Sequence, residues 1–252
     1  MSEWLVLSLA MAAACGVVLA ITVLRQRRIG EDDDPSETPD VIEYMTMMVG
    51  VVYAIVLGLA IAGVWEARGA AQDTVRTEAQ ALHEVSARAR VYPQPVRARI
   101  RSDVDQYVSH VVHKEWPVLA GQGKLTGRGA DLLAKVRADV SDYRPRDSYE
   151  EQSYQGIIDQ VGVADGARSA RGDSAGATLP PVVWFGLLSG AAVTIGLIFT
   201  LQIRRSGREL LMAGLFSALI AFLLFLVWDF DAPFSRGLTA TAEPFTDLFP
   251  HV

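Results

Sequence analysis

The sequence predicts an all-α integral membrane protein with four transmembrane helices and a helical extramembrane insert between the second and third of them. Four apolar runs contain no Asp, Glu, Lys, Arg or His, namely residues 4–24, 44–65, 181–203 and 210–228. Each is long enough to cross a hydrocarbon core of roughly 30 Å, which takes about 20 helical residues. Between the second and third runs, apolar residues recur every three or four positions, which is the spacing of amphipathic helices.

The first run contains Cys15, the single cysteine of the chain. Residues 13–16 resemble a lipoprotein cleavage site, but the apolar run continues to Leu24 and no Lys or Arg precedes it. A signal peptide has a basic start and a shorter apolar core. We therefore expect a retained helix in which Cys15 packs as a small apolar residue. One cysteine also excludes an intramolecular disulfide.

The second run has a small residue at every fourth position: Gly50, Ala54, Gly58 and Ala62. Residues four apart share a helix face, and small ones let another helix approach closely in lipid. Two interpretations remain open, helix packing within one subunit and a face that lines a central axis among identical helices. Because the spans hold no charge, any pore would be narrow and apolar.

The third and fourth runs are joined by a short loop. From the four runs and the helical region between the second and third, we expect four segments along the chain. These are helices 1 and 2 with a short acidic loop (1–65), a helical extramembrane domain (66–180), helices 3 and 4 (181–230) and a C-terminal tail (231–252). Within the second segment, the helix of the second span is predicted to continue to Tyr92, where Pro93 and Pro95 stop it and start another.

Three more features are predicted in the 66–180 segment. The second helix should end near Trp116-Pro117, and the glycine-rich residues 120–129 are predicted to form a loop. A third helix should reach Pro145. A fourth should begin near Ser148, with its periodic pattern lost from Gly162 onward.

Arginines predict the orientation, because Lys and Arg next to the spans favour the cytoplasmic side. Six of them flank the membrane in the two short loops: Arg25, Arg27, Arg28, Arg204, Arg205 and Arg208. We therefore expect both termini and the 66–180 segment outside the cytoplasm. The preference for Arg over Lys and the abundance of Ala, Gly and Val indicate a GC-rich bacterial genome, and so a multi-pass protein of a bacterial cell membrane.

No motif in the chain predicts an enzyme or a bound cofactor. His110 and His113 have a spacing that can present two ligands to a metal ion, but two ligands do not make a site, and a solvated helix face is the better interpretation. The acidic run 32–34 lacks the glycine and distal Glu of a calcium loop. The net charge of -6, without a basic stripe, does not favour nucleic acid.

Three short stretches resemble the bacterial bestrophin-like domain family. The first is Glu115-Trp116-Pro117, which follows Tyr107. The second is residues 179–184, which end at Trp184 and follow Arg168 and Arg171. The third is residues 231–237, with Asp231, Pro233, Phe234 and Gly237. With two spans, a helical insert, two more spans and a short tail, the resemblance covers nearly the whole chain.

The resemblance implies a remote similarity to bestrophins, which are pentameric anion channels with a narrow apolar neck on the second helix. We expect this chain to lack a long C-terminal region for a calcium clasp, and its arginines predict that the insert lies outside rather than in the cytosol. The matching residues are expected to act structurally first. Trp116 and Trp184 suit an interface, since indole is half apolar and half hydrogen-bonding, and Asp231, Pro233 and Phe234 would fold the tail back.

Two functions remain open. The first is an oligomeric, bestrophin-like anion channel whose pore is lined by the second span, with the lipid bilayer, further copies of the chain and small anions as partners. The second is a non-conducting membrane sensor or scaffold that acts through its extramembrane helical domain. Three observations favour the channel: the spans contain no charged residues, the second span carries the small-residue stripe, and the chain resembles the bestrophin-like family.

Overall fold

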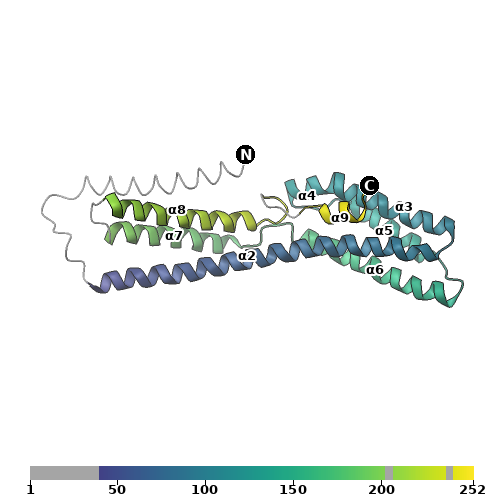
Figure 1. The fold of residues 1–252 in the computed structure, drawn as a ribbon, viewed down its shortest axis with the longest axis horizontal. Coiled ribbons are helices and arrows are strands. Elements are labelled where there is room, and N and C mark those ends of the chain that lie inside the picture. Colours follow the sequence, from purple (N-terminus) through teal and green to yellow (C-terminus); the bar gives the residue numbers. More distant parts are fainter. Residues whose placement is uncertain (1–39, 202–206, 237–240) are drawn as a thin grey trace. The chain divides into compact units, whose positions relative to one another are not determined.

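The computed structural model describes residues 40–201, 207–236 and 241–252, and Figure 1 shows that this part of the chain is helical. It confirms the all-α prediction for these residues, among which no strand occurs. The first predicted span, Cys15 and the acidic run 32–34 lie outside them. The main helices are α2 (Asp40–Arg88), α3 (Gln94–His110), α4 (Trp116–Gln122), α5 (Gly127–Ser141), α6 (Ser148–Asp173), α7 (Pro181–Leu201), α8 (Gly207–Phe230) and α9 (Glu243–Leu248).

The described chain divides into two compact units. The apolar unit holds α2 as far as Trp65 together with Leu179–Asp231, and the helical unit holds Glu66–Thr178 and Ala232–Val252. Among the described residues, three helices are long and apolar enough to cross a bilayer. They are Tyr44–Val91, which covers most of α2 and the short 3-10 helix η1 (Ala89–Val91), Pro181–Phe199 and Leu210–Phe230. They correspond to the second, third and fourth predicted spans, while a total of four spans stays a prediction.

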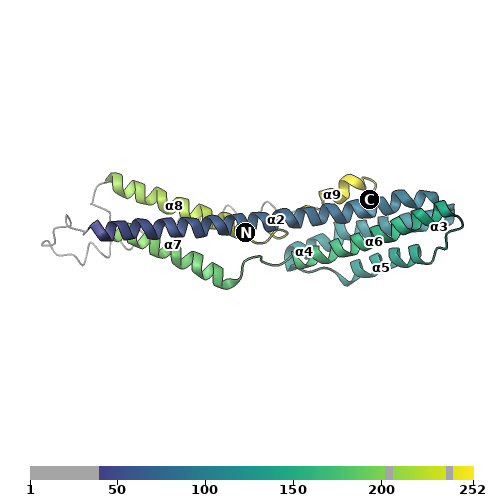
Figure 2. The ribbon, with the colours of Figure 1, turned by 90° about the horizontal axis from the view of Figure 1, so that it is seen from below.

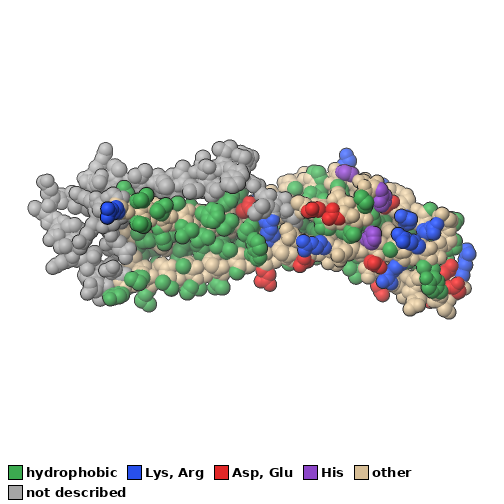
Figure 3. Space-filling view, viewed as in Figure 1, with side chains coloured by type: hydrophobic (Ala, Val, Ile, Leu, Met, Phe, Trp, Pro, Cys, Tyr) green, Lys and Arg blue, Asp and Glu red, His purple; other side chains and the backbone are tan. Residues whose placement is uncertain are grey.

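The apolar unit is held together by one face of each of its helices. Tyr53, Leu57, Leu187, Ile220 and Val227 are buried in a common core. The Tyr53 hydroxyl donates to the Leu187 carbonyl at 3.2 Å. Large apolar side chains cover the outside, as the green surface in Figure 3 shows. An apolar surface of this extent is unfavourable in water and suits contact with lipid.

The helical unit has a separate apolar core. α5 packs against both α3 and α6, and Figure 2 shows these helices side by side. The fully buried core residues include Leu82, Val85, Ile100, Val104, Val108, Leu119, Val136, Ile157 and Phe245. α3 and α5 contribute the apolar faces that their three- and four-residue spacing predicts.

Polar caps explain where α5 and α6 begin. The Thr126 hydroxyl accepts from the backbone N–H of Gly129 at 3.2 Å at the start of α5. The Asp147 carboxylate accepts from the backbone N–H groups of Tyr149 and Glu150 at 2.9 and 2.8 Å. Such caps satisfy N–H groups that have no partner inside the helix. The predicted start of a helix near Ser148 is therefore confirmed.

The prediction that a helix ends near Trp116-Pro117 is wrong. After α3, residues Val111–Glu115 form a π-helical turn, and α4 continues to Gln122. Pro117 lies in the first turn of α4, where the missing N–H needs no partner. The predicted loop 120–129 is consequently shorter and consists of residues 123–126, with Gly123 at a φ of 63°.

The predicted loss of helical pattern from Gly162 onward is also wrong, because α6 runs to Asp173. Its last three turns bury Ala164, Ala167, Arg168 and Arg171. Small residues and paired arginines replace the large apolar residues that the periodicity search looks for. The helix therefore has a buried face that hydropathy does not reveal.

Candidate functional site

The helical unit buries two carboxylates and two guanidinium groups in one cluster. We call Glu78, Tyr107, Glu115, Arg168 and Arg171 the Glu115 network. All five side chains are at most 5 % exposed. They come from α2, α3, the π-helical turn and α6. Segments distant in the sequence therefore meet through charge as well as through apolar packing.

The π-helical turn positions Glu115. In this turn the backbone N–H of Trp116 donates to the carbonyl of Val111, five residues earlier. The extra residue widens the helix just before Pro117, whose ring excludes a regular helical bond at that point. Val111 and Glu115 are both buried as a result. Turns of this kind often occur at functional sites in helices.

Arg171 joins the two carboxylates. Its Nε donates to Glu78 Oε2 at 2.7 Å and its Nη2 to Glu78 Oε1 at 3.1 Å. The same Nη2 donates to Glu115 Oε1 at 2.9 Å. The Nη1 atom has no hydrogen-bond partner among the described residues. The Trp116 ring lies 5.7 Å from the guanidinium carbon, close enough for a cation–π attraction.

Arg168 binds the other side of Glu115. Its Nη1 and Nη2 donate to Glu115 Oε1 and Oε2 at 2.5 and 2.8 Å, which is the two-pronged pairing that fits guanidinium to carboxylate. Nη2 also donates to the Thr126 carbonyl at 2.9 Å. Arg168 therefore ties α6 to both the π-helical turn and the short loop before α5.

Tyr107 and the neighbouring Thr126 make the remaining hydrogen bonds to the Glu115 network. The Thr126 backbone N–H and hydroxyl donate to Glu115 Oε2 at 2.9 and 2.6 Å, and the hydroxyl lies 2.8 Å from His110 Nε2. The Tyr107 hydroxyl donates to Glu78 Oε1 at 2.5 Å and accepts from Arg168 at 3.3 Å. The bonds form a continuous path from half-buried His110 to fully buried Glu78.

The network is electrically balanced, and this shifts its pKa values. Burial alone would raise the pKa of Glu115, but hydrogen bonds from Arg168 and Thr126 and the two arginine charges lower it to about 2. Burial works to lower the pKa of Arg171, and the nearby carboxylates of Glu78 and Glu115 raise it instead. Burial and the Glu78 charge raise the pKa of Tyr107 well above its ordinary value. At neutral pH the arginines and Glu115 are therefore charged and Tyr107 is neutral.

This chemistry is that of a fixed structural link. Glu115 is held as a carboxylate by five donors, so it has no free lone pair for a substrate or proton transfer. A Cβ at Gly129 would lie 2.6 Å from Arg168 Nη2, so α5 packs directly on the pair. Breaking such a buried pair is strongly destabilising.

The two histidines that the sequence singled out have different surroundings. His110 contacts Thr126, and His113 is exposed on the π-helical turn. Among the described residues no three His, Cys, Asp or Glu side chains are grouped so that they could hold a metal ion.

Other residues of the three matching stretches lie in two separate places. In the apolar unit, Asp231 accepts from the Leu179 backbone N–H at 2.6 Å and from Trp184 Nε1 at 3.2 Å. This links the start of α7 to the end of α8. In the helical unit, Phe234 is buried and meets the Trp116 ring edge-on at 5.8 Å. Pro233 is buried, and Gly237 lies outside the described residues.

The small-residue stripe on α2 has no close partner among the described residues. Ala54, Gly58 and Ala62 are exposed and Gly50 is half-buried. A Cβ added at Gly50 or Gly58 would meet no atom within 4 Å. An adjacent face of the same helix buries Tyr53, Leu57 and Val64.

Sequence reasoning missed Glu78 and the joint role of the two arginines. Arg168 and Arg171 stand three residues apart between alanines and glycines, a spacing that puts both on one helix face. That spacing was the available signal. Glu78 carried none, because a lone Glu on a long amphipathic helix looks like an ordinary solvated residue.

Comparisons with known proteins agree with this architecture. The family model of the Bestrophin-like domain matches residues 12–245. A crystal structure of a membrane protein has a similar fold, with a TM-score of 0.64 and 13 % sequence identity, and the match covers 98 % of this chain and 99 % of that one. No curated protein matches the chain. With its apolar helices and a family match over nearly its whole length, this membrane protein belongs to the Bestrophin-like domain family.

Proposed function

We propose that the chain assembles with copies of itself into a membrane channel for small anions, with the pore lined by residues 44–65 of α2. The family relationship supports an anion-channel-like activity. The supporting observation in the fold is that this helix buries only one face within the chain. Ala54, Gly58 and Ala62, on an adjacent face, are exposed in the described part of the chain, and a Cβ added at Gly58 would meet no atom within 4 Å.

The chemistry of this face favours a narrow and selective passage. The 44–65 segment contains no charged side chain, so it offers neither a carboxylate ring for cations nor a proton relay. Small residues allow the helices of several copies to approach an axis closely. Apolar side chains between them would form a constriction that opens or closes by wetting.

Ion flux into liposomes tests this proposal. Liposomes that contain the purified protein should lose an imposed chloride gradient. Gly58→Leu should slow this chloride flux, because the larger side chain fills the proposed lumen. Gly63→Leu is the matched control, since Gly63 lies on the same helix but off the stripe and a Cβ there also meets no atom within 4 Å. The proposal would be contradicted if the wild-type protein gave no chloride flux, or if the two variants reduced the flux equally.

The helical unit favours a second candidate function, a non-conducting membrane sensor or scaffold. It has its own core and its own buried ion-pair network, which a conducting neck does not require. Crosslinking in intact cells distinguishes the two functions. A stable heterologous partner bound to a monomer or dimer favours the sensor or scaffold, whereas a ring of identical chains favours the channel.

A further inference from the structure

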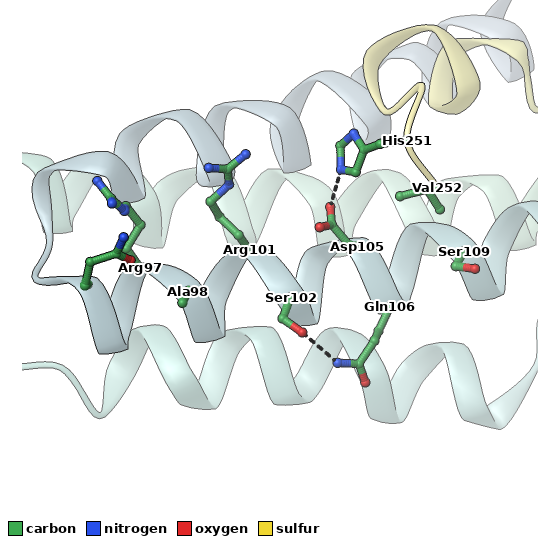
Figure 4. A pocket seen from close by; sticks show the side chains of 10 residues that line it. Arg97, Ala98, Arg101, Ser102, Asp105, Gln106, Ser109, His251 and Val252 are labelled. Atoms are coloured by element: carbon green, nitrogen blue, oxygen red, sulfur yellow. Dashed lines mark hydrogen bonds and ion pairs between the residues drawn. The ribbon is translucent and has the colours of Figure 1, made fainter.

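A groove runs along the exposed side of α3, beside residues that follow α9. We call it the basic groove and define it by Arg97, Arg101, Ser102, Asp105 and His251. Its volume is about 710 Å³, and it is open to solvent. Figure 4 shows Arg97, Arg101 and His251 in a row on one side of α3. All of these residues belong to the helical unit.

The surrounding sequence is locally basic although the chain is acidic overall. No Asp or Glu occurs between Glu84 and Asp103, a stretch that contains Arg88, Arg90, Arg97, Arg99 and Arg101. Arg88 is paired with Glu84 at 3.0 Å. The side chains of Arg97 and Arg101 form no hydrogen bond or ion pair within the described part of the chain, so their donors are available to a ligand in the groove.

Asp105 is the one acidic side chain that lines the basic groove, and it already has a partner. Asp105 Oδ1 lies 3.2 Å from His251 Nε2, so this carboxylate contacts the imidazole. Gln106 donates to the Ser102 hydroxyl at 3.1 Å, which leaves that hydroxyl free to donate in turn. The groove therefore presents two arginine side chains that have no ion-pair partner among the described residues, together with an available hydroxyl donor.

The backbone adds to the positive potential. Arg97 and Arg101 are four residues apart, so they lie one turn apart on the same helix face, about 5–6 Å between their Cβ atoms. α3 begins at Gln94 with no acidic residue in its first turn and no side-chain cap. The positive end of the helix dipole is therefore not neutralised locally.

We propose that the basic groove binds a phosphate monoester group, carried either by a small soluble metabolite or by an acidic lipid headgroup. Two free guanidinium groups match the charge of about -1.5 to -2 on a phosphate monoester, whereas a single carboxylate would compensate only one of them. Arginine also pairs with phosphate oxygens in a two-pronged manner. Binding here is independent of whether the chain conducts ions.

Calorimetric titration of the full-length protein in detergent tests the proposal. The soluble probe is glycerol 3-phosphate, and the lipid probe is short-chain dihexanoyl phosphatidic acid, with dihexanoyl phosphatidylcholine as its zwitterionic control. The double variant R97Q/R101Q should weaken binding at least about tenfold, since it removes two charge-assisted contacts. Arg99→Gln is the control, because it removes one positive charge from the same helix, against two in the double variant, and Arg99 does not line the groove.

Every outcome of this titration either supports or overturns the proposal. Binding of either probe that is lost in R97Q/R101Q and kept in Arg99→Gln supports the proposal, and the stronger of the two probes identifies the source of the phosphate. No binding of either probe to the wild-type protein overturns it. An equal loss in Arg99→Gln also overturns it, because the attraction would then be that of a diffuse basic surface. Circular dichroism of the variants verifies that they remain folded.

Discussion

Glu115 is the residue on which the helical unit depends most. Removing an ion from water costs several kcal/mol unless the protein replaces every lost hydrogen bond. Glu115 is fully buried, and both of its oxygens are filled by donors from Arg168, Arg171 and Thr126. Glu115 therefore stabilises the fold most while both arginines are present. Each arginine in turn needs Glu115 as a counter-charge.

Replacing Glu115 by Gln should destabilise the protein by about 3–5 kcal/mol, because two buried guanidinium groups lose their shared counter-charge. Thermal unfolding of purified protein, followed by circular dichroism, measures the effect. Glu151→Gln is the control. Glu151 is exposed and accepts only from the side chain of Gln155, so its replacement should change stability by less than about 0.5 kcal/mol. Similar losses in the two variants would contradict this role.

The lowered pKa of Glu115 predicts acid sensitivity. The pKa lies at about 2 in the folded protein against an ordinary value of 4.5, so the unfolded chain takes up the proton first as pH falls. The stability that Glu115 contributes is complete above about pH 4.5 and is lost progressively toward pH 2. Melting temperatures across this range should fall more steeply for the wild-type protein than for Glu115→Gln. Parallel curves would show that other carboxylates cause the acid effect.

At the scale of the helices, the spacing of apolar residues predicts which segments are helical better than it predicts where each helix ends. α3 and α5 follow from their apolar spacing, and α6 starts where Ser148 and its acidic neighbours predict. The end of α6 does not follow, because Arg168 and Arg171 occupy positions where the pattern requires apolar residues. The run through Pro117 escapes prediction for another reason, since a π-helical turn shifts the register before the proline.

Two glycines test how tightly α5 and α6 pack. Gly129→Ala should destabilise the protein by about 1–3 kcal/mol, because the added Cβ overlaps Glu115 and Arg168 in a fixed pair. Gly166→Ala should stabilise it by about 0.5–1 kcal/mol, since the site on α6 is exposed and open and Ala favours helix. Opposite signs in the same unfolding assay are expected. A stabilising Gly129→Ala would mean that the ion pair can move aside.

For the molecule as a whole, hydropathy predicts the spans because a bilayer leaves few alternatives to an apolar helix. The Glu115 network is a different matter. Glu78, Glu115 and Arg171 are separated by long stretches of sequence, and no local spacing states which carboxylate meets which arginine. The matching stretches contain Glu115 and stand near Tyr107 and the two arginines, so the resemblance located four of the five residues without their pairing and without Glu78.

The orientation of the chain is the remaining whole-molecule prediction, and single-cysteine labelling tests it. Cys15→Ala provides a background without cysteine. In that background Gln152→Cys places a thiol on the exposed side of α6, and Ser206→Cys places one in the sequence between the last two spans. A membrane-impermeant maleimide should label the first in intact cells and the second only after lysis, because the short loops carry the membrane-flanking arginines. The reverse pattern would put the helical unit in the cytoplasm, as in bestrophins.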